Sequence, residues 1–244
     1  MALLNVRFDA PTLGRPGRLN VVLPEGDGPF PALYLLHGLG GDCDSWLDTS
    51  MPRLAAGLPL ILVMPDGGRG YYCNDGRPGC CEYENHFVND VVPFVDRSFR
   101  TIRSRAGRAI AGASMGGYGS LMLAMRHPDL FCAASSMSGS LYFQHDKHPT
   151  DSEYPSALMA VLPREECDCF RLAGTYRQSG RDLALHFHCG TEDYLLPCNR
   201  QFHERLDGLG IMHRYAEYPG EHDWAYWEAH LKDTLDFIMA NVAS

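Results

Sequence analysis

The sequence predicts an α/β fold, in which helices cover both faces of a mostly parallel β-sheet. Short β-rich apolar runs alternate along the chain with longer stretches of helical character, which is the pattern of such a layered sheet. Continuous apolar runs at Ala32–Leu36, Leu60–Met64 and Arg108–Ala111 are typical of parallel strands that are buried on both faces. Together these observations indicate a sheet of eight strands flanked by helices.

Each expected strand and helix corresponds to a segment of the sequence. Asn5–Phe8 and Arg18–Leu23 are predicted to form an opening antiparallel pair. The next six strands are expected at Ala32–Leu36, Leu60–Met64, Arg108–Ala111, Ala133–Met137, Leu183–His188 and His213–Glu217. Helices are expected at about Asp48–Ala56, Glu84–Phe99, Ser114–Arg126, Asn199–Leu209 and Asp223–Asn241. His127-Pro128 ends the third helix, and Asp223 can cap the last.

The chain is expected to form one domain over residues 1–244. Its 244 residues are 45% hydrophobic and 21% charged, and no change in composition marks a boundary between two cores. Residues 141–182 interrupt the alternation of strands and helices, because they are polar and contain several prolines. A segment of this kind after a strand end predicts a lid or cap insertion over an active site.

Charge and hydropathy exclude several classes of partner. The net charge of −9 leaves no basic excess to bind nucleic acid or an anionic membrane. No apolar stretch approaches the 18 residues of a membrane span. The segment Met1–Asp9 lacks the basic and apolar regions of a signal peptide. A cytoplasmic protein with a small-molecule substrate is therefore expected, and the sequence leaves a homo-oligomer open.

The nine cysteines are expected to be mostly reduced thiols. Two clusters stand out, one at Cys73, Cys80 and Cys81 and one at Cys167 and Cys169. Neither has the paired C-x-x-C spacing of a zinc site. No metal is therefore expected there.

The segment Gly112-Ala-Ser114-Met-Gly116 matches the G-x-S-x-G pattern. It follows a predicted strand and begins a predicted helix, which is the context of a nucleophile elbow. The two glycines allow the sharp turn, and the turn lifts the Ser114 hydroxyl above the sheet edge at a helix N-terminus, where negative charge is favoured. Ser114 is therefore the candidate nucleophile.

A serine hydroxyl needs a base to become a nucleophile. In this type of fold the three catalytic residues follow one another along the chain in the order serine, acid, histidine. Asp193 follows the strand predicted at Leu183–His188, and His222 lies between the next strand and the last helix. Both loops open at the carboxyl edge of the sheet, where Ser114 is presented. Asp193 and His222 are the candidate acid and base.

Other residues could in principle fill these roles. Glu192 is adjacent to Asp193 and is the alternative acid. His213 falls in or before a strand and His230 lies within a helix, so both are interpreted as structural. His186 and His188 have the i, i+2 spacing of one strand face, which could suit a metal pair, but hydrogen-bonded core histidines are the preferred interpretation.

An oxyanion hole requires hydrogen-bond donors beside the nucleophile. The backbone N–H of Met115 directly follows Ser114, and the loop after the strand Ala32–Leu36 offers a second donor from Leu39 or Gly40. His37, at the start of that loop, is interpreted as a structural hydrogen-bonding residue.

These segments together resemble the esterase D-like esterase family of α/β-hydrolases. The resemblance spans most of the chain and lies in Tyr34-Leu-Leu-His-Gly-Leu-Gly-Gly41, Asp44-Ser-Trp46, Met64-Pro-Asp-Gly-Gly68, Gly112-Ala-Ser-Met-Gly-Gly-Tyr-Gly119, Cys189-Gly-Thr-Glu-Asp193 and His222-Asp-Trp-Ala-Tyr-Trp227. It implies an α/β-hydrolase fold with Ser114, Asp193 and His222 as nucleophile, acid and base. It also implies an oxyanion hole from Leu39 and Met115.

The family includes small tributyrin-type carboxylesterases, S-formylglutathione hydrolases, acetyl-xylan and feruloyl esterases, and mycolyltransferases. The compact length and the His-Gly-Leu-Gly segment look closest to the tributyrin-type enzymes, whereas S-formylglutathione hydrolases usually carry Ser-Gly-Leu-Thr there. The resemblance thus implies a serine carboxylesterase that hydrolyses short-chain acyl esters through an acyl-enzyme, without a cofactor. Acyl transfer by the same triad and a non-catalytic binding scaffold are the alternatives.

Several residues beside the catalytic loops are candidates for the substrate pocket. Gly40 lies in the loop of the oxyanion hole, Tyr194 follows Asp193 and Trp224 follows His222. Tyr142 and Phe143 begin the predicted lid. Core packing explains such aromatic residues about equally well.

Overall fold

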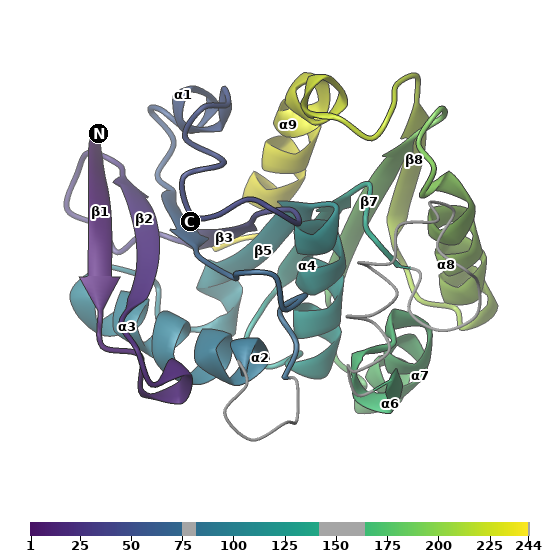
Figure 1. Ribbon diagram of the computed structural model, residues 1–244, viewed down its shortest axis with the longest axis horizontal. Helices are drawn as coiled ribbons and strands as arrows, with labels where there is room; N and C mark the ends of the chain where they lie inside the picture. Colours follow the sequence, from purple (N-terminus) through teal and green to yellow (C-terminus); the bar gives the residue numbers. More distant parts are fainter. Residues whose placement is uncertain (75–81, 142–163, 244) are drawn as a thin grey trace.

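The computed structural model describes residues 1–74, 82–141 and 164–243, and it contains a single eight-stranded sheet (Figure 1). The strand order is β1-β2-β4-β3-β5-β6-β7-β8. The strands are β1 Ala2–Phe8, β2 Gly17–Leu23, β3 Ala32–Leu36, β4 Ile61–Pro65, β5 Arg108–Ala113, β6 Ala133–Met137, β7 Ala184–Gly190 and β8 Arg214–Tyr218. The antiparallel pairs are β1 with β2 and β2 with β4, and all other pairs are parallel. The predicted fold class and opening antiparallel pair are confirmed.

Helices pack on both faces of the sheet because the strand side chains alternate between two apolar cores. On β3, Tyr34 and Leu36 enter the core that contains α4 (Met115–Arg126), whereas Leu33 and Leu35 enter the core on the opposite face. The first face also carries α3 (Val92–Ser98), α7 (Cys169–Ser179) and α8 (Leu196–Gly208). The opposite face carries α1 (Met51–Leu54) and α9 (Trp224–Met239).

The predicted helices exist, but some differ in extent or type. The first is a single turn, Met51–Leu54, and not the longer helix expected over Asp48–Ala56. The segment expected as one helix over Glu84–Phe99 consists of α2 (Tyr83–Asn85), the π-helical turn η2 (His86–Val91) and α3. The last helix begins where expected, because the Asp223 side chain accepts a hydrogen bond from Tyr226 N at 2.8 Å.

Part of the predicted lid segment is helical. Residues 142–163 lie outside the described residues, whereas α6 (Arg164–Cys167) and α7 follow them. Sequence analysis did not predict α7, although Asp168 caps it through Phe170 N and Gly180 ends it in the left-handed region, with φ 67°. α7 packs beside α4 and α8, so this part of the segment is a layer of the fold. A lid in the remaining part stays a prediction.

No helix within the described residues combines the length and the apolar character needed to cross a membrane.

The backbones of β3 and the start of α4 approach each other closely. A Cβ atom added at Gly116 would lie 2.1 Å from the carbonyl oxygen of Leu36. One added at Gly112 would lie 2.5 Å from the backbone of Gly116. Glycine is required at both positions because no side chain fits between these segments, as the G-x-S-x-G pattern predicts.

Replacing Gly116 by alanine is therefore expected to destabilise the protein by about 1–3 kcal/mol or more, because the new methyl group overlaps a backbone oxygen. The free energy of unfolding in urea measures the loss. Gly174→Ala is the matched control, because a Cβ at that helical position meets its nearest neighbour at 3.6 Å. Equal stability of the two variants would contradict the close approach.

Candidate active site

Ser114 occupies a strained turn between β5 and α4. Its backbone has φ 56° and ψ −118°, a conformation that residues with a side chain rarely adopt. The turn is held by hydrogen bonds from Ser114 N to Met137 O at 2.9 Å and from Ser140 N to Ser114 O at 3.1 Å. Strain of this kind persists where the surrounding structure enforces it, and it is common at functional sites.

The structure brings Ser114, His222 and Asp193 together. His222 Nε2 lies 2.9 Å from Ser114 Oγ, and His222 Nδ1 lies 2.9 Å from Asp193 Oδ2. The aspartate accepts from Nδ1–H, so the neutral ring presents an unprotonated Nε2 that accepts the serine proton. The three residues form one continuous chain of hydrogen bonds from carboxylate to hydroxyl.

The environment of Asp193 keeps its carboxylate charged. Burial raises the pKa of Asp193, but the hydrogen bond and charge of His222 and the backbone N–H of Leu195 outweigh it, so that the pKa lies below its ordinary value. Leu195 N donates to Asp193 Oδ1 at 2.8 Å while Oδ2 bonds His222. Both carboxylate oxygens are therefore engaged, and the histidine is held in one tautomer.

The alternative acid and bases have other partners. The Glu192 carboxylate accepts from the backbone N–H of Gly220 and from the Thr191 hydroxyl, and it is exposed. His230 Nδ1 pairs with Asp233 at 3.4 Å, and its ring stacks on Tyr218. The structure therefore brings neither Glu192 nor His230 into the chain of hydrogen bonds at Ser114.

His186 and His188 are buried on the face of β7 that packs against α9. His186 Nδ1 bonds Ser135 Oγ at 2.9 Å, and His188 Nδ1 bonds Tyr226 Oη at 2.8 Å. Burial lowers the pKa of His186 to about 4 and holds the pKa of His188 well below its ordinary value. Both behave as hydrogen-bonded core histidines, as the sequence predicts.

The two residues predicted to form an oxyanion hole, Met115 and Leu39, lie next to Ser114 in the chain and in the same cavity, respectively. Met115 is the first residue of α4, so its N–H has no partner within the helix. Leu39 lines the same cavity as Ser114. The loop containing Leu39 passes close to the serine, because a Cβ added at Gly38 would lie 3.5 Å from Ser114 Cβ.

His37 anchors this loop. Its Nδ1–H donates to Gly38 O at 2.8 Å and its Nε2 accepts from Gly67 N at 2.9 Å, so both ring nitrogens are occupied. Burial lowers the pKa of His37, which favours the neutral ring that this pairing requires. The sequence-based interpretation of His37 as a structural residue agrees with these contacts.

Ser114 and His222 open into a cavity of about 1150 Å³. The predicted pocket residues Gly40, Tyr194 and Trp224 line it, whereas Tyr142 and Phe143 lie outside the described residues. Further lining residues that sequence analysis did not predict are Asp48, Thr49, Tyr71, Ser140, Trp227 and Glu228.

Aromatic rings form one side of the cavity. The Tyr194 ring lies 4.7 Å from the ring of His222, and Trp227 meets the same imidazole edge-on at 5.1 Å. Trp224 packs edge-on against both Trp227 and the buried Trp46, at 5.0 and 5.4 Å. Since Trp224 and Tyr194 are 42% and 39% exposed, they offer apolar contact area at the mouth of the cavity.

The charges at the cavity are acidic. Asp48, Asp223 and Glu228 line it, and no lysine or arginine does so among the described residues. Such a cavity binds uncharged or cationic molecules more readily than anions.

The cysteines within the described residues are free thiols: Cys43, Cys73, Cys132, Cys167, Cys169, Cys189 and Cys198. Burial raises the pKa of Cys73 and Cys169 well above the ordinary value, so both remain protonated. Cys80 and Cys81, in the first predicted cluster, lie outside the described residues.

A family model described as "Putative esterase" matches residues 10–238. The chain belongs to this esterase family. An esterase of Mycobacterium tuberculosis (strain ATCC 25618 / H37Rv), Rv1288, is 32% identical over 249 residues, which cover 88% of this chain and 54% of that protein. The chain thus spans about half the length of this esterase relative. The predicted family resemblance is confirmed.

Two other comparisons cover nearly the whole chain. An acetyl esterase of Caldicellulosiruptor saccharolyticus is 25% identical over 263 residues, with 98% of each chain aligned. A solved structure described as a ferulic acid esterase has a TM-score of 0.85 at 28% identity, covering 98% of this chain and 97% of that one. Each of these two alignments therefore includes almost all of this chain.

The lowered pKa of His186 makes the stability of the protein depend on pH. The unfolded chain binds a proton near pH 6.5, whereas the native chain does so only at about 4. The unfolded state therefore holds more protons between these values, and the native state loses up to about 1.4 kcal/mol per pH unit as the pH falls.

His186→Leu is expected to remove the contribution of this titration to stability. Between pH 4 and 6.5 the unfolding free energy of the variant should depend less steeply on pH than that of the wild type, by up to about 1.4 kcal/mol per pH unit. Urea denaturation between pH 4 and 7 measures it. Phe237→Leu is the control, because Phe237 packs on the His186 ring at 4.9 Å but carries no titratable group. An unchanged slope in His186→Leu would contradict a neutral buried histidine.

Proposed function

We propose that the protein is a serine carboxylesterase that hydrolyses short-chain, uncharged acyl esters. The observation that carries the proposal is the continuous chain of hydrogen bonds Ser114–His222–Asp193 at the wall of the cavity. This arrangement supplies a nucleophile, a base and a group that orients the base. Membership of the esterase family supports the same reaction.

In the first half-reaction, His222 Nε2 removes the Ser114 proton as Oγ attacks the acyl carbon. The Oγ–acyl bond forms, and negative charge collects on the carbonyl oxygen, where the N–H groups of Met115 and Leu39 are proposed to donate. The ester C–O bond then breaks, and the His222 proton passes to the departing alcohol. An acyl-enzyme remains.

In the second half-reaction, water attacks the acyl-enzyme. His222 takes a proton from the water, whose oxygen bonds to the acyl carbon. The Oγ–acyl bond breaks, the proton returns to Ser114, and the carboxylic acid leaves. Asp193 stays ionised throughout and stabilises the imidazolium form of His222.

The lining of the cavity supports the choice of substrate class. The carboxylates of Asp48, Asp223 and Glu228 repel an anionic alcohol or thiol portion, and the described lining residues include no cation to bind one. S-formylglutathione carries a net negative charge, so it is the less suitable substrate. Neutral alcohol portions can pack on Trp224 and Tyr194.

The triad variants give the first test. Ser114→Ala is expected to lower kcat/KM for p-nitrophenyl acetate by about 10⁴-fold or more, because the nucleophile is gone. Asp193→Asn is expected to lower it by about 10⁴-fold, because the amide favours the wrong histidine tautomer.

The control for Asp193→Asn is Glu192→Gln, which changes the adjacent carboxyl group that contacts Gly220 and not His222. It should keep kcat/KM within about threefold of the wild type, since surface substitutions usually have small effects. Equal losses in Glu192→Gln and Asp193→Asn, or wild-type activity in Ser114→Ala, would disprove the assigned roles.

A matched pair of substrates tests the preference for uncharged esters. We expect a higher kcat/KM for 4-acetoxybenzamide than for 4-acetoxybenzoate, by up to about tenfold, because repulsion near the cavity carboxylates is of the order of 1 kcal/mol. The ratio should shrink at high ionic strength.

Glu228→Gln should narrow this ratio, whereas Glu204→Gln, on the exposed surface of α8, should leave it unchanged. Equal kcat/KM values for the two substrates in the wild type would refute the preference while leaving the hydrolase mechanism intact.

A further inference from the structure

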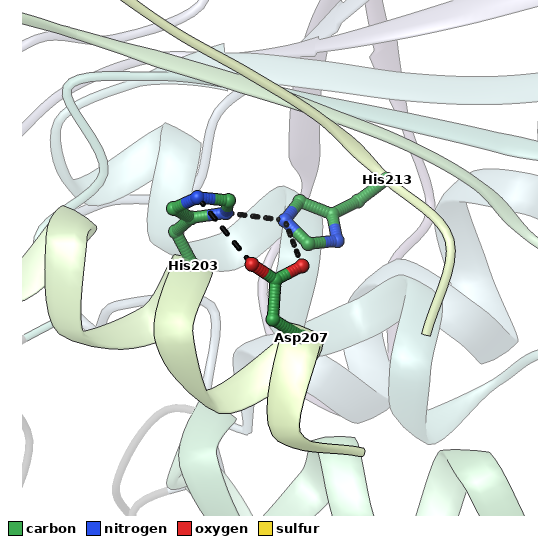
Figure 2. Close-up of side chains that lie close together, drawn as sticks. All are labelled: His203, Asp207 and His213. Carbon is green, nitrogen blue, oxygen red and sulfur yellow. Dashed lines mark hydrogen bonds and ion pairs between the residues drawn. The ribbon is translucent and has the colours of Figure 1, made fainter. Parts of the chain in front are cut away.

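A cluster of two histidines and an aspartate lies where α8 leads into β8. His203 and Asp207 are one turn apart on α8, and His213 directly precedes β8 (Figure 2). Within the residues that the structure describes, this is the one group of three or more potential metal ligands whose ligand atoms lie within 4.8 Å of one another. Asp193 and His222 follow the carboxyl ends of β7 and β8, whereas this cluster lies at the amino end of β8. It is therefore separate from the candidate active site.

The hydrogen bonds of the cluster join its two histidines but leave the Asp207 carboxylate without a direct hydrogen bond to either ring. His213 Nδ1 donates to Ile211 O at 2.8 Å, so Nε2 of the neutral ring carries a lone pair. His203 Nδ1 lies 2.7 Å from that Nε2 and is its donor. His203 Nε2 faces the Asp207 carboxylate at 3.6 Å, which is longer than a hydrogen bond. This ring nitrogen and the carboxylate therefore lie side by side without a direct hydrogen bond.

The ligand side chains are oriented by their surroundings. Tyr215 stacks on the His203 ring at 4.7 Å, and Phe187 stacks on the His213 ring at 5.5 Å. The His213 side chain is 3% exposed, whereas those of His203 and Asp207 are 36% and 63% exposed. The site is therefore built on a fixed histidine and has an open path from solvent, as an exchangeable metal site requires.

We propose that His203, Asp207 and His213 bind one divalent transition-metal ion of the zinc class. Imidazole nitrogens and carboxylate oxygens are ligands that zinc prefers. Since zinc bonds both at about 2.0–2.2 Å, two of its ligand atoms lie at most about 4.4 Å apart. One ligand atom from each of the three residues lies within 4.8 Å of the other two, so small side-chain movements bring all three to a single ion.

The ion would be held by Nε2 of His213, one ring nitrogen of His203 and an oxygen of Asp207, with water completing a four-coordinate shell. The hydrogen bond from His213 Nδ1–H to the Ile211 carbonyl fixes the orientation of the ring, as such bonds do for metal-binding histidines. Binding links α8 to the start of β8 and takes no part in ester hydrolysis.

The experiment is a calorimetric titration of Zn²⁺ into the full chain after dialysis against a chelator. The wild type should bind one Zn²⁺ per chain, and excess Zn²⁺ should raise its melting temperature, because the ion binds only the native arrangement of ligands. His203→Gln and Asp207→Asn should each weaken the affinity by about tenfold or more, which is the size of effect seen when even outer-shell contacts are lost.

His230→Gln is the matched control, because His230 is also a partly buried helical histidine beside an aspartate, Asp233, at 3.4 Å. It should bind Zn²⁺ as the wild type does. Since the side chains of His203 and Asp207 are 36% and 63% exposed, their variants should fold and should hydrolyse p-nitrophenyl acetate at the wild-type rate.

Zn²⁺ affinity that is unchanged in both cluster variants would place the ion at a cysteine or at the active site and would overturn the proposal. Equal weakening in His230→Gln would overturn it too, as would a wild type that binds no Zn²⁺. Lost binding in variants that retain their circular dichroism and hydrolysis supports it.

Discussion

The contact between Gly116 and the carbonyl group of Leu36 is the constraint on which the candidate site depends. It allows α4 to start directly against the end of β3, at a separation that excludes a side chain. The chain can then turn from β5 into α4 only through the strained conformation of Ser114. The same approach brings the loop after β3 beside the serine, so the nucleophile and both proposed oxyanion donors depend on one contact between backbones.

The parallel sheet supplies the remaining groups because its strands share a carboxyl edge. Ser114 follows β5, Asp193 follows β7 and His222 follows β8, and these loops meet at that edge. β6 lies between β5 and β7, and its end stabilises the strained turn through the carbonyl of Met137 and the N–H of Ser140. The strain at Ser114 is thus offset by hydrogen bonds from the neighbouring strand and not by the helix alone.

The sequence predicts the sheet well because burial on two faces leaves a strong pattern of continuous apolar residues. It predicts the order of Ser114, Asp193 and His222 for a similar reason, since strand ends locate loops. Helix α7 was not predicted, because it lies in a mostly polar segment that was interpreted as a lid. Its capping residues, Asp168 and Gly180, do not stand out from their polar neighbours.

The lining of the cavity was largely unpredictable from sequence. Asp48, Tyr71 and Glu228 lie in three distant segments, and only the tertiary arrangement brings them to one space. Part of the proposed metal-binding cluster has a sequence pattern, since His203 and Asp207 are spaced i, i+4 on a helix. The third residue, His213, comes from another segment. Sequence analysis interpreted His213 as structural, and nothing in the local pattern relates it to α8.

The histidines of this protein demonstrate how environment divides one residue type among different roles. His37, His186 and His188 are buried, and burial lowers the pKa of each, so the imidazoles act as neutral hydrogen-bonding groups that join neighbouring segments of the fold. Among the histidines that the structure describes, His222 alone places a carboxylate on one ring nitrogen and a serine hydroxyl on the other.

For His186 and His188, which lie within β7, this difference from His222 follows from position in the sheet. A histidine within a strand faces packed side chains, whereas a histidine in a loop at the carboxyl edge can contact both an acid from a neighbouring loop and the cavity. The His222 side chain retains 13% exposure, so that its ring reaches substrate while Asp193, with no exposed side-chain surface, stays shielded from solvent. A buried carboxylate stabilises the protonated ring that it faces, and His222 combines such a carboxylate with the Ser114 hydroxyl at the cavity, so it is well placed to accept the serine proton.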